Sequence, residues 1–245
     1  MSTSSSRGPA VVVGAGPGLG MSVARRLGRA GHTVALVSRN AARHPGYVAE
    51  LAAEGVRGSA HAADARDLGA LSAAFGAITD RHGPVEVLYF GPGAADPAAM
   101  PVPITRADVE GVREAVEGWV YPAVAAVGEV LPGMLERGRG GLLFAGGLSG
   151  AVPMPPLGAL AVSSAALRGY VLTLNAGLAG TGVYAGLLTI GGLVERGDIH
   201  RMITSQPGTF GDLAARTLDP DEIAEAAWGL LTKRDEPEAT FSTLG

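Results

Sequence analysis

Short apolar segments alternate with longer helix-like stretches along almost the whole chain, and this alternation constrains the fold more than any other feature. The segments are apolar on both faces and bounded by glycine, proline or polar residues, as expected of strands buried in a parallel sheet. We expect strands at 10–13, 33–37, 56–63, 85–90, 142–145 and 183–190, and an edge strand at 239–242. Helices are expected near 18–30, 45–54, 67–82, 106–137, 157–179 and 220–233. This order predicts an α/β fold, a doubly wound parallel sheet with helices on both faces.

The length of 245 residues suits one domain. The polar, serine-rich stretch 1–9 is predicted to be a disordered tail, followed by a single domain over 10–245. Within it, 191–218 has weak periodicity and is expected to form a loop or lid. The tail has no apolar core of a signal peptide, and no uninterrupted apolar stretch approaches the ~18 residues of a membrane span. We therefore expect a cytoplasmic protein without a membrane partner.

Glycine is unusually abundant, with 38 residues, but it follows no Gly-X-Y period, which excludes collagen. The 47% apolar content excludes a disordered chain. The absence of cysteine excludes disulfides, thiolate zinc sites and a thiol nucleophile. A net charge of −4 argues against nucleic-acid binding.

A glycine-rich loop follows the first expected strand and leads into the first helix. It has the pattern G-x-x-x-G-x-G, at Gly14, Gly18 and Gly20. Glycine at such positions allows a tight turn, close approach of the backbone to a pyrophosphate and close packing of helix on strand, and the helix N-terminus attracts phosphate. A purely structural strand–helix turn is the alternative. The predicted cofactor contacts from this loop are Gly14, Pro17, Gly18, Leu19 and Gly20.

The end of the second expected strand indicates which nicotinamide cofactor fits. No acidic residue stands where an NAD site carries one for the ribose. Arg39 is instead available for a 2′-phosphate, helped by the Ser38 hydroxyl, so NADP(H) is preferred over NAD(H). A solvated surface arginine is the alternative. Asp64 follows the third strand, where an adenine amino group could lie, and Asp67 is expected to cap the next helix.

These features together resemble the short-chain dehydrogenase/reductase family, from Val11 to about Trp228. The resemblance rests on the glycine loop, on Asp64 after the third strand and on the helix phrase Ala165–Gly169. It implies a Rossmann-like sheet that binds a nicotinamide cofactor, and it adds three cofactor contacts to those above: Asn40, Ala65 and Gly91. It also implies a homodimer or homotetramer formed through the fourth and fifth helices.

The resemblance fails at the catalytic residues. The family carries a serine after the fifth strand and a Tyr-x-x-x-Lys pair on the next helix; the corresponding positions here are Gly147, Leu160 and Ser164. The supporting asparagine of the fourth helix falls near Trp119. A hydride-reduced carbonyl leaves an alkoxide that must be stabilised and protonated, and neither glycine nor leucine does so. The sequence thus indicates an atypical member that lacks the acid–base residues.

Substitute groups are few. Among the histidines only His200 lies in the expected lid, where an exposed loop histidine is the favoured interpretation. Tyr89, at the end of the fourth strand, could donate a proton but is more simply a packing residue. Glu195 and Asp198 are interpreted as solvated lid residues, and no cluster of histidines and acidic residues suits a metal ion. The serines nearest the missing site are interpreted first as turn or helix residues. The serines are Ser149, Ser163 and Ser164.

The predicted substrate pocket is largely apolar and comprises Tyr89, Gly147, Leu148, Ser149, Met154, Leu160, Leu193 and Met202. Ordinary core packing is the alternative for several of these. We expect an NADP(H)-dependent oxidoreductase that acts on an apolar or iminium-like small molecule. Two alternatives stay open: a non-redox cyclase or isomerase that uses the same pocket, and a cofactor-binding pseudoenzyme.

Overall fold

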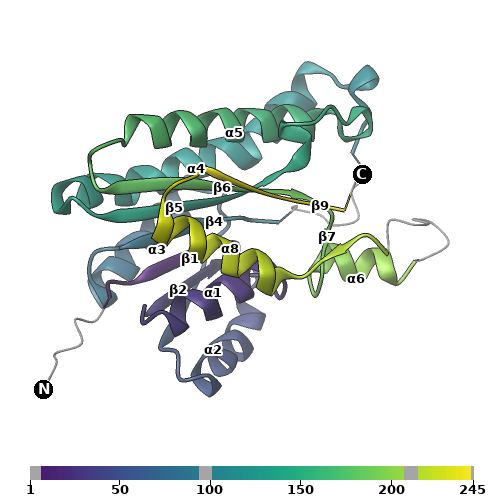
Figure 1. The fold of residues 1–245 in the computed structure, drawn as a ribbon. Coiled ribbons are helices and arrows are strands. Elements are labelled where there is room, and N and C mark those ends of the chain that lie inside the picture. The colour runs from purple at the N-terminus through teal and green to yellow at the C-terminus, as the bar shows by residue number, and fades with distance from the viewer. Residues whose placement is uncertain (1–6, 94–100, 207–214, 244–245) are drawn as a thin grey trace, which may run out of the picture.

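A seven-stranded parallel sheet forms the centre of the molecule (Figure 1). The computed structural model describes residues 7–93, 101–206 and 215–243. The strand order is β3-β2-β1-β4-β5-β6-β9, and every neighbouring pair is parallel. The strands are β1 (Ala10–Val13), β2 (Val34–Ser38), β3 (Gly58–Ala62), β4 (Val87–Phe90), β5 (Gly140–Gly147), β6 (Val183–Gly191) and β9 (Glu238–Ser242).

This topology confirms the predicted doubly wound fold. The order reverses between β1 and β4, and ligands bind at such switch points, outside the carboxyl ends of the strands. β1 matches its expected bounds, and β9 is the expected edge strand, paired with β6. β5 is longer than expected because its glycine-rich ends, Gly140–Gly141 and Gly146–Gly147, also pair with β6.

Helices cover both faces of the sheet and bury two apolar clusters against it. One face carries α3, α4 and α5, whose buried side chains pack with Val11, Phe90 and Phe144. The other carries α1, α2 and α8, which pack with Val12, Leu36 and Tyr89. The helices are α1 (Leu19–Arg29), α2 (His44–Ala53), α3 (Leu68–His82), α4 (Val109–Arg137), α5 (Ala159–Gly177) and α8 (Pro220–Lys233).

Helix starts follow the capping signals in the sequence. Asp67 accepts a hydrogen bond from the Ala70 backbone N–H and caps α3, as predicted. Asp219 does the same for α8 through the Asp221 N–H, with Pro220 at the first helical position. The capping residues in the local sequence therefore set the starts of both α3 and α8.

Helix α4 is by length and composition the one described helix that could cross a membrane. Its inner face carries Ala123, Ala126, Val130 and Met134, which are buried in the apolar cluster on the face of the sheet that α3, α4 and α5 cover. The helix also packs along α5. We therefore describe it as a core helix of this domain.

The stretch 191–218 contains more regular structure than the expected loop. It forms β7 (Leu193–Val194), α6 (Asp198–Thr204) and β8 (Thr217–Leu218), with β7 and β8 paired in a small parallel ribbon. These elements are too short for their periodicity to be recognised in the sequence. Residues 207–214 of this stretch lie outside the described residues.

The N-terminal tail also differs from expectation in its last residues. The Gly8 N–H donates to Glu86 at 2.6 Å, and the Pro9 carbonyl accepts from the Glu86 N–H at 2.9 Å. Arg7 lies 4.9 Å from the ring centre of Trp228. Residues 7–9 are thus docked on the domain, whereas residues 1–6 lie outside the described residues.

Candidate functional site

The glycine loop lies at the point where the strand order reverses. Gly14 has a φ of +91°, and a Cβ there would lie 2.4 Å from the carbonyl oxygen of Gly91, which follows β4. At Gly20 a Cβ would lie 2.5 Å from the Gly14 carbonyl oxygen, so α1 packs tightly on the turn. Gly16 has no such neighbour, since its nearest atom is 3.9 Å away. Gly14 and Gly20 are therefore required by the turn itself, as predicted.

The first turn of α1 is chemically suited to a phosphate group. Gly18 caps the helix without a side-chain hydrogen bond, and no acidic residue stands in the first turn. The backbone N–H groups and the positive end of the helix dipole therefore face no competing carboxylate from the helix. Pro17 and Leu19, the other predicted contacts of this loop, are half-buried beside the turn.

A short segment covers this helix start. Residues 195–198, which we name the strap, lead from β7 into the first residue of α6. A Cβ at Gly18 would lie 2.9 Å from the Glu195 carbonyl oxygen and 3.0 Å from the Gly197 nitrogen. Arg196 adopts a left-handed φ of 66°. A glycine at position 18 is thus needed for the strap to lie this close to the start of α1. The sequence alone did not indicate this role.

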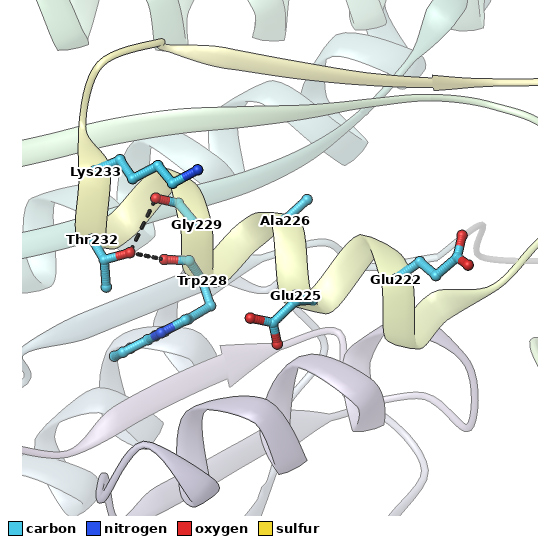
Figure 2. Close-up of a pocket in the computed structure, with 7 residues that line it drawn as sticks. All are labelled: Glu222, Glu225, Ala226, Trp228, Gly229, Thr232 and Lys233. Atoms are coloured by element: carbon cyan, nitrogen blue, oxygen red, sulfur yellow. Dashed lines mark hydrogen bonds between the residues drawn. The ribbon is translucent and has the colours of Figure 1, made fainter.

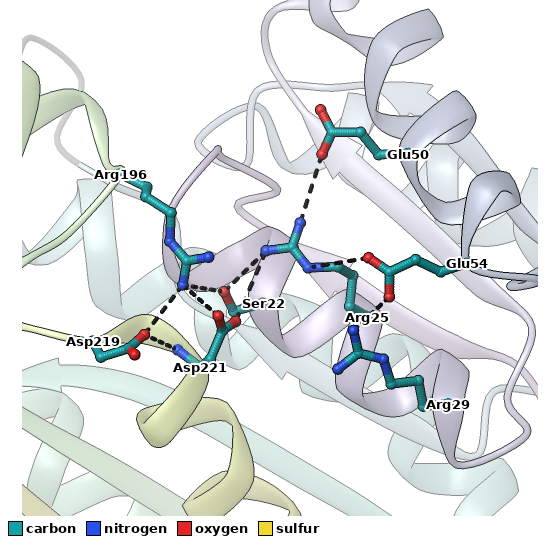
Figure 3. A network of polar contacts seen from close by, with 8 residues as sticks. All are labelled: Ser22, Arg25, Arg29, Glu50, Glu54, Arg196, Asp219 and Asp221. Atoms are coloured by element: carbon teal, nitrogen blue, oxygen red, sulfur yellow. Dashed lines mark hydrogen bonds and ion pairs between the residues drawn. The ribbon is translucent and has the colours of Figure 1, made fainter.

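Ion pairs fasten the strap to its surroundings (Figure 3). Arg196 pairs with Asp221 at 2.8 Å and Asp219 at 3.2 Å at the start of α8, and donates to Ser22 of α1 at 3.4 Å. Arg25 of α1 continues the network to Glu50 of α2 and to Glu54, which follows the last residue of α2. The strap is therefore tied to three helices on one face of the sheet.

Polar side chains gather beyond the carboxyl end of β2. Ser38 Oγ lies 2.9 Å from His44 Nε2, and Asn40 accepts from the Ala42 N–H to cap a short 3₁₀ turn. Arg39 lies near Asp64, whose pKa it helps to lower. Two predicted contacts, Ser38 and Asn40, thus already have hydrogen-bond partners within the protein.

Arg43 is a functional candidate that sequence reasoning missed. Its Nη1 donates to Asp198 of the strap at 2.7 Å, and this contact holds the pKa of the Asp198 carboxyl below its usual range. A second arginine four residues after Arg39 was the available signal. Arg43 places another cation beside the segment that would meet a 2′-phosphate.

Asp64 is held by Arg66 more closely than expected. Its Oδ1 accepts from the Arg66 backbone N–H and Nε, and its Oδ2 accepts from Nη2 at 2.7 Å. These contacts lower the pKa of Asp64. Ala65, the next residue, is buried in the apolar cluster on the face of the sheet that α3, α4 and α5 cover.

The three positions aligned with the family's catalytic residues fall at the end of β5 and on α5. A Cβ at Gly147 would lie 3.1 Å from Ser164 Oγ and 3.3 Å from Ser149 Oγ. Ser164 is buried on α5, whereas Leu160, one turn earlier, is 36% exposed. The structure therefore brings Gly147, Ser149 and Ser164 together and leaves Leu160 with an accessible side chain.

Of the other predicted pocket residues, Leu148 is buried and packs against Gly191 of β6. A Cβ at Gly191 would lie 2.3 Å from Leu148 Cδ2, so the glycine makes room for this side chain. Leu193 is buried on β7, and Met154 and Met202 are half-buried, on the approach to α5 and on α6. Neither methionine belongs to the two buried apolar clusters.

Tyr89 does not belong to the pocket. It pairs in register with Val12, so strand alternation turns its side chain into the cluster beneath α1 and α8. A Cβ at Gly91 would lie 2.3 Å from its hydroxyl. Burial also raises the pKa of the phenol far above its usual value, which makes it a weaker acid than an exposed tyrosine.

The remaining polar candidates have separate surroundings. Ser163 donates to the Leu160 carbonyl within its own helix. His200 is half-buried on α6, and its Nδ1 is enclosed without a hydrogen-bond partner in the described structure. Trp119 likewise has an enclosed, unpartnered Nε1 on α4.

A surface pocket of about 500 Å³ lies elsewhere, along the exposed side of α8 (Figure 2). Trp228 forms one wall, and Arg26 lies 4.6 Å from its ring centre. None of the predicted site residues lines this pocket, which is formed by Glu222, Glu225, Ala226, Trp228, Gly229, Thr232 and Lys233.

Comparisons with known proteins agree with this geometry. A putative ketoacyl reductase of Streptomyces coelicolor is 31% identical over 236 residues, which cover 88% of this chain and 87% of that protein. L-sorbose reductase of Gluconobacter frateurii, solved with NADPH and L-sorbose, superposes with a TM-score of 0.84 at 20% identity; the match covers 99% of this chain and 97% of the other. A short-chain oxidoreductase of Pseudomonas aeruginosa, described as containing an atypical catalytic centre, superposes with a TM-score of 0.80 at 20% identity over 98% of both chains.

The family model for short-chain dehydrogenases matches residues 9–199. The match begins just before β1 and ends in α6, and so includes the glycine loop, the end of β5, α5 and the strap. Because it covers more than half of the chain, this protein belongs to the short-chain dehydrogenase family.

Proposed function

We propose that this protein is an NADP(H)-dependent oxidoreductase that works without the serine, tyrosine and lysine of its family. The observation that carries the proposal is the contrast between two neighbouring sites. The glycine cradle at Gly14 and Gly20 is kept in a form that a Cβ would block. The positions expected to handle protons are Gly147, Leu160 and Ser164.

The residues present fit a dinucleotide phosphate. The uncapped start of α1 offers backbone N–H groups to the diphosphate, and the glycine at position 14 lets the loop after β1 pack closely on Gly91 at the switch point. Arg39 is proposed to hold the 2′-phosphate, with Arg43 as a second cation nearby. When bound, the nicotinamide would supply or accept a hydride. The preference for NADP(H) is consistent with the NADPH-bound relative described above.

The substrate site would position a small apolar molecule rather than exchange protons with it. Leu148 and Leu160 would contribute apolar surface, and Gly147 lies close to the hydroxyls of Ser149 and Ser164. No phenol or ammonium group stands at the catalytic positions, so a substrate whose reduction needs little acid assistance fits best. An iminium ion, already cationic, is one such group.

Deuteride transfer tests this proposal. The protein would be incubated with NADPH deuterated separately on each face of C4, together with panels of apolar ketones and cyclic imines. Stereospecific appearance of deuterium at the former carbonyl or imine carbon is expected. Conversion of a substrate without cofactor oxidation would instead support the non-redox cyclase or isomerase, which would use the apolar pocket to position its substrate. NADPH binding without turnover across the panels would support a pseudoenzyme.

We further propose a homodimer or homotetramer formed through α4 and α5. Apolar side chains are exposed on both helices, among them Tyr121 and Val124 on α4 and Val162 on α5. Replacing Val124 by Glu should shift the molar mass measured by light scattering towards the monomer. Leu68→Glu changes an equally exposed apolar residue on α3 and should leave the mass unchanged; equal masses for wild type and Val124→Glu would contradict the proposal.

A further inference from the structure

His44 is a buried histidine in direct contact with the segment proposed to meet a 2′-phosphate. It is the first residue of α2 and is 9% exposed, and its Nε2 lies 2.9 Å from Ser38 Oγ. Ser38 is the last residue of β2 and is half-buried, whereas Arg39, which follows it, is exposed. The imidazole therefore lies behind the serine hydroxyl, on the protein side of the proposed phosphate site.

Backbone hydrogen bonds fix the end of β2 beside the glycine loop. The Gly14 and Ala15 N–H groups both donate to the Val37 carbonyl, at 2.9 and 3.2 Å. Val37 pairs in register with Val13, the last residue of β1. Ser38, the next residue, thus ends its strand next to the loop proposed to hold the diphosphate, where the adenosine ribose of a dinucleotide is expected.

The direction of the hydrogen bond between His44 and Ser38 decides what the serine can do for an anion. A serine hydroxyl has one proton to donate. If it donates to Nε2, only its oxygen lone pairs are left, and these repel a phosphate. If Nε2 carries a proton and donates to Oγ, the hydroxyl proton is available to the phosphate. A protonated imidazole donates from both nitrogens, so it permits the second arrangement alone.

The surroundings of His44 hold the ring neutral in the free protein. Burial lowers its pKa, and a hydrogen bond to the Ser38 backbone offsets part of this effect. The charged or titratable groups on the neighbouring elements are cationic when protonated: Arg39 after β2, Arg43 in the 3₁₀ turn and His61 on β3, whose pKa the charge of His44 lowers. A phosphate dianion beside Ser38 would reverse the balance, because a nearby negative charge favours the protonated ring.

We propose that His44 determines specificity for the 2′-phosphate by donating from Nε2 to Ser38 Oγ, which leaves the Ser38 hydroxyl to donate to the phosphate. His44 acts through Ser38 and is therefore a positioning residue. The proton that the ring gains on binding comes from solvent. This inference rests on the proposed function and deepens it, since the preference for NADP(H) over NAD(H) then increases as the pH falls from about 8 to about 6.

Titration of NADP⁺ and NAD⁺ at about pH 8 and about pH 6 tests the inference by affinity alone. On acidification the wild-type preference for NADP⁺ should increase about 3- to 10-fold relative to His44→Gln, the scale of one hydrogen bond. The glutamine amide still donates to Ser38 but does not titrate. Comparison with this variant also cancels the titration of the 2′-phosphate itself, whose pKa is about 6.

His82→Gln is the matched control. His82 Nε2 also lies 2.9 Å from a serine hydroxyl, that of Ser59, but on α3 and away from the end of β2. This variant should keep the wild-type pH dependence. In a Ser38→Ala background, His44→Gln should have no further effect, because the hydroxyl that couples His44 to the phosphate is missing.

The wild-type protein gives a second measurement that needs no variant. Calorimetric titration at about pH 7 in two buffers of different ionisation enthalpy should show net proton uptake with NADP⁺ and none with NAD⁺. Equal pH dependence in the wild type and His44→Gln, or the same loss in His82→Gln, would overturn the inference while leaving an NADP(H) site in place. A folded wild-type protein that binds no NADP⁺ would instead contradict the proposed function, and the inference with it.

Discussion

Arg43 donates a 2.7 Å hydrogen bond to Asp198 and thereby joins the segment after β2 to the strap that covers the start of α1. Both side chains are about two-fifths exposed, so the pair itself contributes little to stability. Its interest is its position, because Arg43 ends the short 3₁₀ turn that follows Asn40, beside the segment proposed to bind the 2′-phosphate. Asp198 and a phosphate group would then compete for Arg43.

Replacing Asp198 by Asn should therefore tighten NADPH binding about 2- to 5-fold, the scale of one exposed ion pair, and leave NADH binding unchanged. Isothermal titration with both cofactors measures this. Glu110→Gln, which removes an exposed ion pair with Arg113 on α4, is the control and should change neither affinity. An equal gain for NADH would show that the strap, rather than competition for Arg43, is what limits binding.

Gly18→Ala should destabilise the fold by about 1–3 kcal/mol, the usual cost of overpacking. The added Cβ would meet backbone atoms of Glu195 and Gly197, which cannot rotate away. Gly16→Ala meets no atom within 3.9 Å and should change the free energy of unfolding by less than about 1 kcal/mol. Urea unfolding of the two variants measures the difference; equal losses would mean that the strap does not rest on Gly18 in solution.

Stability should fall as the pH drops below about 6.5, the unperturbed value for histidine. His61 and His82 share Ser59 Oγ at 3.1 and 2.9 Å, and burial lowers the pKa of both rings. A lowered folded-state pKa means that the unfolded chain binds protons first, so this contribution is complete above pH 6.5 and is lost on acidification. The double variant His61→Gln/His82→Gln should show a smaller drop in melting temperature between pH 7 and 5; an unchanged drop would place the acid sensitivity elsewhere.

Restoring the family's residues should create ordinary carbonyl reductase activity if only the proton-handling groups are missing. The triple variant Gly147→Ser, Leu160→Tyr, Ser164→Lys supplies all three. Leu160 is accessible enough to accept a tyrosine, and removal of Ser164 Oγ relieves the 3.1 Å contact that a side chain at 147 would make. Ketone-dependent NADPH oxidation, absent in Leu160→Phe, is the expected result. A folded, NADPH-binding triple variant without activity would contradict the assignment of these positions.

Much of the fold could be predicted because its signals are local. The apolar strands and the caps Asp67 and Asp219 act within a few residues, and their predicted elements are confirmed. The short β7–β8 ribbon could not be predicted, because two-residue strands carry no periodicity and their pairing depends on distant residues.

The candidate site was predictable where glycine marks a backbone requirement, as at Gly14 and Gly20. It was not predictable where the face of a strand or a long-range contact decides. Tyr89 was expected in the pocket, but its register with Val12 directs it into the core. The Arg43–Asp198 pair joins residues 155 positions apart, and nothing local to either residue indicates it.

Direct titration of NADPH and NADH into the wild-type protein and Arg39→Ala tests the central claim, that the chain retains an NADP(H) site beside an altered catalytic centre. The wild-type protein should bind NADPH more tightly than NADH. Arg39→Ala should lose roughly tenfold or more in NADPH affinity, the scale of a hydrogen bond to a charged group, while NADH affinity stays the same. No binding of either cofactor by the folded wild-type protein, or equal NADPH affinities in both proteins, would contradict this account.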